Sequence, residues 1–424
     1  MRQFVVALTL AALPALGMAH SAAPASAASA ASAPANTVRP EFGKLLQAAQ
    51  DLLRAGSPKE ALVKLAEAEA LPSPTPFEAM MTQRIKAAAA FGAGDIAGSI
   101  TAFESALGSP LMGGVERRAA MESTIKLAVQ VKDMPRAVRW FKIYFDEGGS
   151  DANLRDLYPQ VLGVAGDNAA AVRETQALIK ANDAAGKPTS EALLRTLGAS
   201  ANAIGDKAAY QAALERLVVV APSEQYWADL ISRVSARDGF ADERLRLDLY
   251  RLMQAVGMAL EGSELLDMAE RALAAGQPIE AKRVLDQGAA AGVLAKLKDQ
   301  AGLQKLVAQV NKAAGQDSAT LAESGRSALA AKDGNALVAI GLAHWSPGSA
   351  DKAAELMTQG MAKGGLRRPD EANLRLGMVL ASVPGKADAA SRALGAFGAV
   401  GGNDGTADLA RMWTLHLRRS DAKQ

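Results

Sequence analysis

The chain of 424 residues contains no cysteine. It therefore cannot form a disulfide, a thiolate nucleophile, a Cys-ligated zinc or iron–sulfur site, or an acylated lipoprotein N-terminus. Neither sign of charge dominates, because 47 Lys and Arg stand against 45 Asp and Glu, and both are interspersed along the chain. This balance argues against nucleic acid as a partner, since nucleic-acid binders concentrate basic residues.

Aromatic and β-branched residues are also scarce; Phe, Trp and Tyr together make up 4% of the chain. Ala, Leu, Lys, Glu, Gln, Arg and Met are abundant instead, which favours helices over strands. The sequence therefore predicts an all-α protein. A chain of this length normally forms two or three globular domains, unless it is a repeat array that grows by stacking.

Long hydrophobic runs are limited to one place, the N-terminus. Arg2 precedes an apolar run from Phe4 to Leu16, and Gly17-Met18-Ala19 follows it. This order is typical of a secretory signal peptide over residues 1–19, and the run is shorter than the ~20 residues that cross a bilayer. We expect cleavage after Ala19, no membrane span in the mature form, and a periplasmic location.

The residues after the signal peptide, 20–38, are mostly Ala, Ser and Pro. They offer almost no large apolar side chain to bury, so a flexible tether is expected there. Ordered structure should begin near Pro40.

From there the sequence repeats a cassette of an amphipathic stretch, a Gly-Asp or Lys-Asp turn, a small residue and a large apolar residue four positions later. Its period is about 34 to 39 residues, which indicates stacked supersecondary units. The small-residue position falls at Ala61, Ser99, Ala137, Ala171, Tyr210, Ala281, Ala353 and, more loosely, Ala390.

Each cassette describes two antiparallel helices joined by a short turn. In the first copy Gly56 ends one helix and Ser57-Pro58 opens the next. Small residues let the two helices approach, and the large residues fill the space between successive pairs. A single pair cannot bury its apolar face, so the pairs must stack into a continuous core.

The clearest copy carries Ala87, Ala90, Gly94-Asp95, Ser99, Phe103, Ala106 and Pro110. This pattern resembles the tetratricopeptide repeat (TPR), which implies a right-handed superhelical α-solenoid of stacked antiparallel helix pairs. The pattern is interrupted by a longer helix predicted over Leu294 to Val310. We accordingly expect an N-terminal TPR-like array over 39–290, a longer irregular helical connector over 291–332, and C-terminal pairs over 333–424 that end in a capping helix.

The chain as a whole resembles exported proteobacterial TPR proteins that accompany the TonB energy-transduction system. The resemblance implies a periplasmic accessory of TonB-dependent outer-membrane transport whose partner is an envelope protein or peptide. The segments that carry it are Phe42-Gly43-Lys44, Tyr226 to Leu230, Ala281 to Gly288, Gly364 to Pro369 and Gly401 to Leu409.

A search for chemistry in the sequence finds little. There is no phosphate-binding loop, no Gly-x-Ser-x-Gly, no His-Glu-x-x-His and no EF-hand run, and the three histidines lie far apart. Adjacent carboxylates such as Asp242 and Glu243 fit solvated helix faces, since neighbouring positions on a helix diverge. We therefore predict no catalytic residue, no metal and no cofactor.

The remaining candidates are surface residues. The resemblance places six polar residues on the first helices of the pairs, which line the groove of such arrays and would suit an acidic peptide or a C-terminal carboxylate. The alternative is that they are ordinary solvated side chains. The six are Arg84, Lys126, Asn153, Arg195, Asn202 and Asn335.

A second candidate patch combines Tyr226, Trp227 and Arg233, an aromatic pair beside a cation, as in many binding hot spots. The alternative is that either ring packs between neighbouring helix pairs. Two functional classes follow. The favoured one is a noncatalytic protein-interaction scaffold; the other is a small-molecule-binding protein or enzyme with a pocket between the two stacks near residues 290–330.

Overall fold

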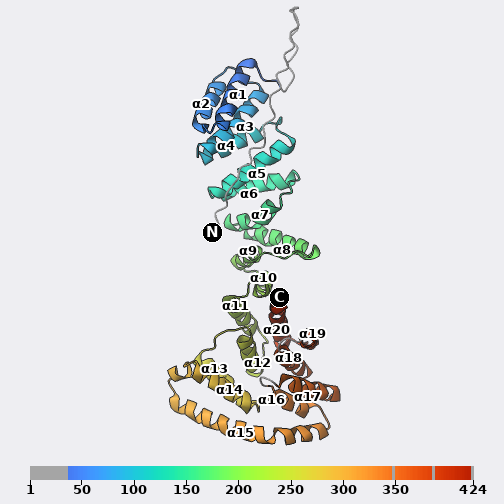
Figure 1. Cartoon of the computed structure of the whole chain (residues 1–424). Coiled ribbons are helices and arrows are strands. Elements are labelled where there is room, and N and C mark those ends of the chain that lie inside the picture. Colours follow the sequence, from blue (N-terminus) through green and yellow to red (C-terminus); the bar gives the residue numbers. More distant parts are fainter. Residues whose placement is uncertain (1–36, 346–348, 384–386, 422–424) are drawn as a thin grey trace, which may run out of the picture. The chain divides into compact units, whose positions relative to one another are not determined.

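A computed structural model describes residues 37–345, 349–383 and 387–421 (Figure 1). Every regular element in these residues is a helix, and successive helices pack as pairs, which confirms the predicted all-α solenoid class and gives a TPR-like repeat. The predicted signal peptide and residues 20–36 of the predicted tether lie outside the described residues. The chain divides into two units: residues 37–189 with 199–205, and residues 190–198 with 206–421.

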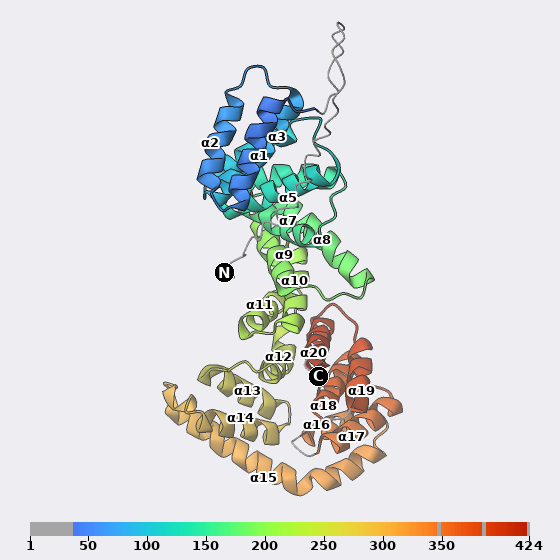
Figure 2. The ribbon, with the colours of Figure 1, turned by 45° about the horizontal axis from the view of Figure 1, so that its top comes forward.

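Unit 1 is an open row of helix pairs in which each pair packs on the next (Figures 1 and 2). The pairs are α1 (Pro40–Arg54) with α2 (Pro58–Glu69), α3 (Pro76–Gly92) with α4 (Ile96–Leu107), α5 (Gly114–Gln130) with α6 (Met134–Asp146), and α7 (Ala152–Val164) with α8 (Asn168–Ala184). Helix α9 (Glu191–Ala203) is divided between the two units after residue 198.

The predicted turn dipeptides end one helix and start the next. Gly94 has a φ of +83°, a left-handed conformation that glycine adopts without steric cost. Asp95 then caps α4 by accepting a hydrogen bond from the Gly98 backbone N–H at 2.8 Å. In the third pair Lys132 takes the place of the glycine with a φ of +61°, and Asp133 caps α6. Such a cap contributes about 1 kcal/mol to stability.

The small residues of the cassette lie where the helices of a pair cross. Ala61, Ser99 and Ala137 are fully buried. The Ser99 hydroxyl donates to the carbonyl of Ala87 on the partner helix at 2.8 Å, so even the polar member is satisfied. Phe141, four positions after Ala137, is fully buried in the core that runs through unit 1. The repeat pattern of the sequence thus corresponds to the packing of the helices.

Unit 2 contains the C-terminal helices. They are α10 (Lys207–Val220), α11 (Glu224–Ser235), α12 (Asp242–Ala255), α13 (Gly262–Ala274), α14 (Pro278–Ala290), the 3-10 turn η1 (Leu294–Lys296), α15 (Gln300–Ala330), α16 (Asn335–Ala343), α17 (Ala350–Lys363), α18 (Pro369–Ala381), α19 (Ala387–Gly398) and α20 (Thr406–Asp421).

Unit 2 closes on itself instead of forming an open row. The last helix, α20, packs against α10, α12, α18 and α19, and Figures 1 and 2 both show it beside α12. Trp413 on α20 is buried against Phe397, with ring centroids 6.1 Å apart. The backbone N–H of Ala241 also donates to the Asp404 carbonyl at 2.8 Å. The terminal helix, expected to cap an exposed end, therefore joins the last pairs to the start of the same unit.

The long helix of unit 2 differs from the prediction over Leu294 to Val310. It begins at Gln300, because the Asp299 side chain caps it by accepting from the Gly302 N–H at 2.8 Å. Leu294 lies in the preceding 3-10 turn η1 and is buried there. Its side chain packs in the core, but the residue is not part of the long helix. The helix then runs on to Ala330, well beyond the predicted end.

The predicted domain boundaries at 39–290, 291–332 and 333–424 remain predictions. Along the chain the division between the two units falls within residues 190–205, and the whole of 291–332 belongs to unit 2. No helix in the described part of the chain is both long enough and apolar enough to cross a membrane.

Candidate functional site: a first-helix face and a buried ionic ladder

Three predicted groove residues of unit 1, Arg84, Lys126 and Asn153, lie on first helices of their pairs, and Asn202 lies on α9. Arg84 on α3 forms an ion pair with Glu116 on α5 at 2.6 Å, and its side chain is only 14% exposed. Its Nε is buried and has no hydrogen-bond partner among the described residues. Arg84 therefore joins two consecutive first helices, a structural role that the sequence did not indicate.

The other groove candidates of unit 1 are more accessible. Lys126 on α5 is 41% exposed, and its closest carboxylate oxygen, on Glu122, is 3.7 Å away. Asn153 on α7 and Asn202 on α9 are exposed, and their side-chain amides make no hydrogen bond within the described residues. These three side chains can thus offer their donors to a ligand without breaking a strong internal contact.

A charge cluster on the second helices α4 and α6 shows the opposite behaviour. Glu104 on α4 accepts from the Trp140 indole N–H at 2.7 Å and pairs with Arg136, 3.4 Å away, and with Arg139. One carboxylate therefore serves three side chains of α6. In this cluster the charges bind one pair to the next, whereas other second-helix cations, Lys142 on α6 and Arg173 and Lys180 on α8, are exposed.

An aromatic cluster between α6 and α7 was not found from the sequence. Phe145 and Tyr158, both half-buried, have ring centroids 5.4 Å apart, and the Arg155 guanidinium lies 3.8 Å from the centroid of Phe145. Burial, with nearby carboxylates as a lesser cause, raises the pKa of Tyr158. The run of aromatic residues on α6 could have indicated this cluster, since the rest of the chain has so few.

The second predicted patch lies in unit 2 and is arranged differently from the prediction. Trp227 on α11 is 1% exposed and belongs to the core, in agreement with the packing alternative, and Tyr226 is half-buried beside that core. Arg233 donates to Asp229 at 2.7 Å and lies 4.0 Å from the ring centroid of Tyr210 on α10. The cation therefore stacks on Tyr210, because Asp229, one turn earlier on α11, holds it there.

Two further candidates in unit 2 have different surroundings. Arg195 is exposed, and Glu191, one turn earlier on the same helix, is 3.6 Å away. Asn335 at the start of α16 is engaged instead. Its amide N–H donates to the Gly365 carbonyl at 3.0 Å, and its Oδ1 accepts from the Arg367 backbone N–H at 3.0 Å. Asn335 therefore holds the segment before α18 in place.

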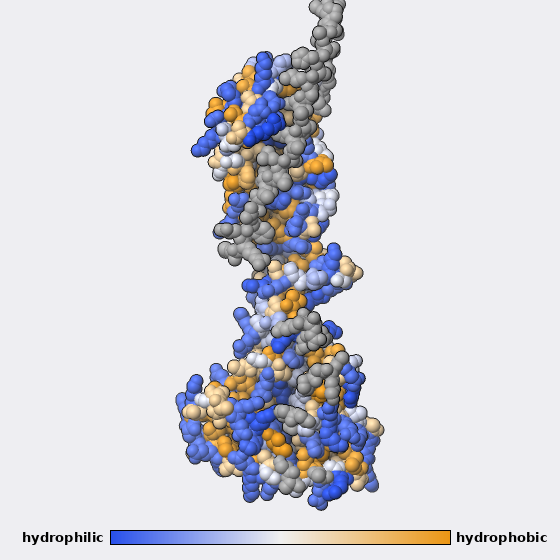
Figure 3. Space-filling view, viewed as in Figure 1, coloured by the Kyte–Doolittle hydropathy of each residue, from blue (hydrophilic) through white to orange (hydrophobic). Residues whose placement is uncertain are grey.

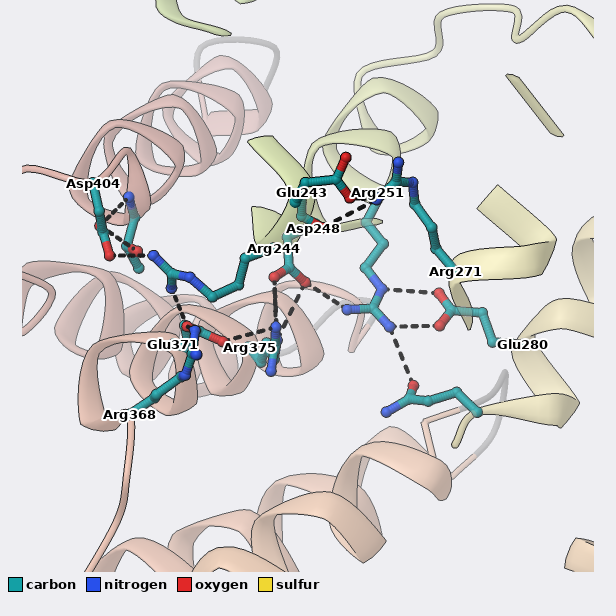
Figure 4. Close-up of polar contacts among 12 residues, drawn as sticks. Glu243, Arg244, Asp248, Arg251, Arg271, Glu280, Arg368, Glu371, Arg375 and Asp404 are labelled. Carbon is teal, nitrogen blue, oxygen red and sulfur yellow. Dashed lines mark hydrogen bonds and ion pairs between the residues drawn. The ribbon is translucent and has the colours of Figure 1, made fainter. Parts of the chain in front are cut away.

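The most unusual feature of unit 2 is a ladder of alternating charges that connects α12, α14, α18 and the loop before α20 (Figure 4). None of its members was predicted as a site residue. In order, the ionic ladder is Asp404, Arg244, Glu371, Arg375, Asp248, Arg251 and Glu280, with Arg368 also paired to Glu371.

The centre of the ionic ladder is buried. The Arg251 side chain is 3% exposed and that of Asp248 is 0% exposed. Arg251 donates to Asp248 at 2.5 Å and to the side-chain oxygen Oε1 of Gln277 at 3.1 Å. It also donates to both carboxylate oxygens of Glu280, at 2.9 and 2.5 Å. Asp248 also accepts from Arg375 at 3.0 Å. Every charge at the centre therefore has an opposite charge in direct contact, which buried ions require.

Two acids of the ladder, Asp248 and Asp404, have pKa values lowered toward the charged form. Burial alone would raise the pKa of Asp248, but the guanidinium groups of Arg375 and Arg251 outweigh it and lower that pKa. Asp404 behaves in the same way: burial opposes ionisation, while hydrogen bonds from Thr406 and Arg244 lower its pKa to about 2. Asp248 and Asp404 are therefore ionised at neutral pH.

The described residues contain no cluster of His, Asp and Glu that could hold a metal ion. A cavity of about 280 Å³ does lie near the region where the sequence analysis placed an alternative small-molecule pocket. Leu285 on α14, Leu294, and Leu303 and Val307 on α15 contribute to its lining, which is mainly apolar.

No protein-family model matches the chain, and no curated protein matches it. Among solved structures, 28 chains match. One is from the structure of Naa15/Naa10 bound to HypK-THB, with a TM-score of 0.33 and 13% identity over 85% of this chain and 63% of that chain. This chain therefore spans less than two thirds of the length of that one.

Proposed function

We propose that the protein is a noncatalytic scaffold that binds another protein or a peptide through the first-helix face of unit 1. One contrast carries the proposal. Lys126 and Asn153 on consecutive first helices keep accessible donors, whereas Glu104 and its partners on the second helices are consumed by internal contacts. Exposed amide and ammonium donors along an array of rigid helices suit an extended ligand with carboxylate or carbonyl oxygens.

The proposal includes a location and a partner class. The sequence of residues 1–19 supports export, and the resemblance to TonB-associated repeat proteins supports a periplasmic partner from the machinery of outer-membrane transport. Exported protein should carry a new N-terminus at His20. N-terminal sequencing of the protein from fractionated cells tests this, and an intact residue 1 in the cytoplasmic fraction would contradict it.

Site-specific photo-crosslinking in cells tests the binding face. A benzoylphenylalanine at Asn153 should form an adduct with an envelope protein, and one at Gln176, which is exposed on the second helix α8, should not. Equal adducts from both positions, or none from Asn153, would refute the face. An adduct with a protein outside the TonB system would remove only that part of the proposal.

Charge reversal supplies the matched pair of variants. Lys126→Glu should abolish the adduct at Asn153, because it places a negative charge where acidic groups of the ligand are expected. Lys142→Glu makes the same change on the exposed second-helix face of α6 and should leave the adduct intact. Loss of the adduct in both variants would indicate a general effect of charge and contradict a specific first-helix site.

A second candidate function, small-molecule binding, has one observation in its favour, the cavity between α14 and α15. Replacing Leu303 by tryptophan should fill that cavity. A metabolite that raises the Tm of the natural protein but not of Leu303→Trp would support this alternative, whereas equal Tm shifts would exclude this cavity.

A further inference from the structure

A different cavity, of about 270 Å³, lies in unit 2 beside the ionic ladder. Its walls come from α12, the turn between α13 and α14, α16, residues 366–368 and α18. These elements are far apart in sequence and meet because unit 2 closes on itself. The cavity is thus a product of the closed arrangement and has no counterpart in a single repeat.

The charges that line this cavity are unbalanced. Four guanidinium groups, those of Arg251, Arg367, Arg368 and Arg375, contribute to its walls against one carboxylate, Glu371. The other acids of the ionic ladder do not line the cavity. Glu371 pairs with Arg368, and Asp248 and Glu280 pair with Arg375 and Arg251 from behind the wall. The remaining surplus of positive charge comes from Arg367, and it favours a negatively charged ligand.

Several donors on these walls remain free. Arg375 uses Nε and Nη2 for Asp248 and Glu371, and its Nη1 has no partner within the described residues. Arg368 uses only Nη1, for Glu371. The guanidinium of Arg367 forms no ion pair or hydrogen bond with any described residue, although its backbone is fixed by Asn335. A planar guanidinium with free N–H groups is suited to carboxylate and phosphate oxygens.

Another part of the lining is apolar. Leu247 on α12 and Val338 and Leu342 on α16 form this part. A ligand could therefore bury an apolar group here while its negative charge lies near the guanidinium groups. The volume of about 270 Å³ lies slightly below the range of roughly 300–1,000 Å³ that is usual for small-molecule sites, so only a small ligand would fit. A small amphiphilic anion fits these walls, whereas an inorganic ion alone would leave the apolar wall unused.

We propose that this cavity binds a small organic anion whose carboxylate or phosphate group lies against Arg367, Arg368 and Arg375 and whose apolar part lies against α16. The site is independent of the first-helix face of unit 1, and either can exist without the other. Asn335, predicted as a direct contact of a partner, acts here as a positioning residue that holds the segment carrying Arg367 and Arg368.

Isothermal calorimetry on the full mature chain tests the site with three probes: 4-methylpentanoate, phenyl phosphate, and the neutral 4-methylpentanamide. At least one of the two anions should bind, with an affinity that falls as salt is added, and the amide should not. The tighter anion identifies the head group. Absence of binding by both anions at millimolar concentration, or equal binding of the amide, would overturn the proposal.

Two matched substitutions locate the binding. Arg367→Gln removes a guanidinium that forms no ion pair or hydrogen bond with a described residue and interacts only at longer range with Asp333. The fold should therefore be little affected, and the Kd for the bound anion should rise at least tenfold. Arg326→Gln removes an exposed arginine on α15 that does not line the cavity and should leave the Kd unchanged. Equal affinity of Arg367→Gln and the natural protein would refute the site, as would an equal loss in both variants.

Discussion

Methionine in place of Arg251 supplies a long, unbranched and apolar side chain but removes the charge at the centre of the ionic ladder. Glu280, only 5% exposed, then loses the two hydrogen bonds of 2.9 and 2.5 Å that Arg251 provides. Breaking a buried pair in this way costs about 3–5 kcal/mol. Glu280 would keep only a longer contact with Arg283, 3.7 Å away. Asp248 suffers less because it keeps Arg375. We therefore expect unit 2 to lose about 4 kcal/mol of its free energy of unfolding.

The double variant Arg251→Met, Glu280→Met should be much less damaged than the sum of the two single variants. It removes both charges together, and a buried pair can often be exchanged for apolar residues at little cost. The double-mutant cycle should give a coupling energy of about 1–3 kcal/mol. That range follows from direct contact between the two side chains.

Urea denaturation followed by tryptophan fluorescence can isolate unit 2. Of the four tryptophans, Trp140 lies in unit 1, and the others, at 227, 345 and 413, lie in unit 2. In a Trp140→Phe background the signal reports unit 2 alone. If the two single variants and the double variant are additive within about 0.5 kcal/mol, or if Arg251→Met costs less than about 1 kcal/mol, the argument from burial is refuted.

Three further predictions concern a helix crossing and two titrating groups. Gly341→Ala should destabilise unit 2 by about 1–3 kcal/mol in urea, because the new Cβ would lie 2.6 Å from Cγ of Met357, while Gly395→Ala, with open space around it, should be neutral or stabilising. Burial, with the nearby Arg419 as the second cause, lowers the pKa of His416 to about 4; the unfolded chain then binds the extra proton below pH 6.5, and His416→Phe should make stability fall less steeply from pH 6.5 to 4. Although burial opposes it, hydrogen bonds from Arg39 and the Thr75 backbone lower the pKa of Glu78 to about 2. Glu78→Gln should therefore cost unit 1 about 3 kcal/mol at pH 7 and little at pH 2, and an equal cost at both pH values would contradict this.

The repeat structure of unit 1 could be predicted because its determinants are local. Ala61 and Ser99 lie at crossings, and the dipeptide Gly94-Asp95 forms its turn, since each needs only the few residues around it to be recognised. The start of α15 was predicted wrongly from the same kind of local pattern. Nothing in the sequence distinguishes Asp299, whose side chain caps the helix, from other charged residues.

The ionic ladder could not be predicted in the same way. Arg251 and Glu280 are 29 residues apart, and Arg375 and Asp248 are 127 apart, so only the closed packing of unit 2 brings them together. One signal was present in the sequence. Asp248 occurs three residues after Leu245 and four before Leu252, so it shares the apolar face of α12, where a solvated carboxylate would not be expected.

The first-helix candidates show a further limit of sequence reasoning. Arg84 and Lys126 are both candidate groove positions of the repeat. Arg84, however, is only 14% exposed and forms an ion pair, whereas Lys126 is 41% exposed. The difference comes from Glu116, which lies at the start of the next first helix and can reach Arg84. Placing a residue on the correct face therefore does not decide whether it is free to bind.

The attachment of α20 to α10 and α12 has a consequence for the order in which the chain acquires its structure. The pairs of unit 1 need only their neighbours, so they can become ordered one after another. Unit 2 has to wait for its last segment, because Arg244 meets Asp404 across 160 positions of sequence. Non-local closure of this kind slows folding. Chains truncated before residue 404 should therefore have an ordered unit 1 and an incomplete unit 2, and a chaperone that binds unfolded segments should bind them in unit 2.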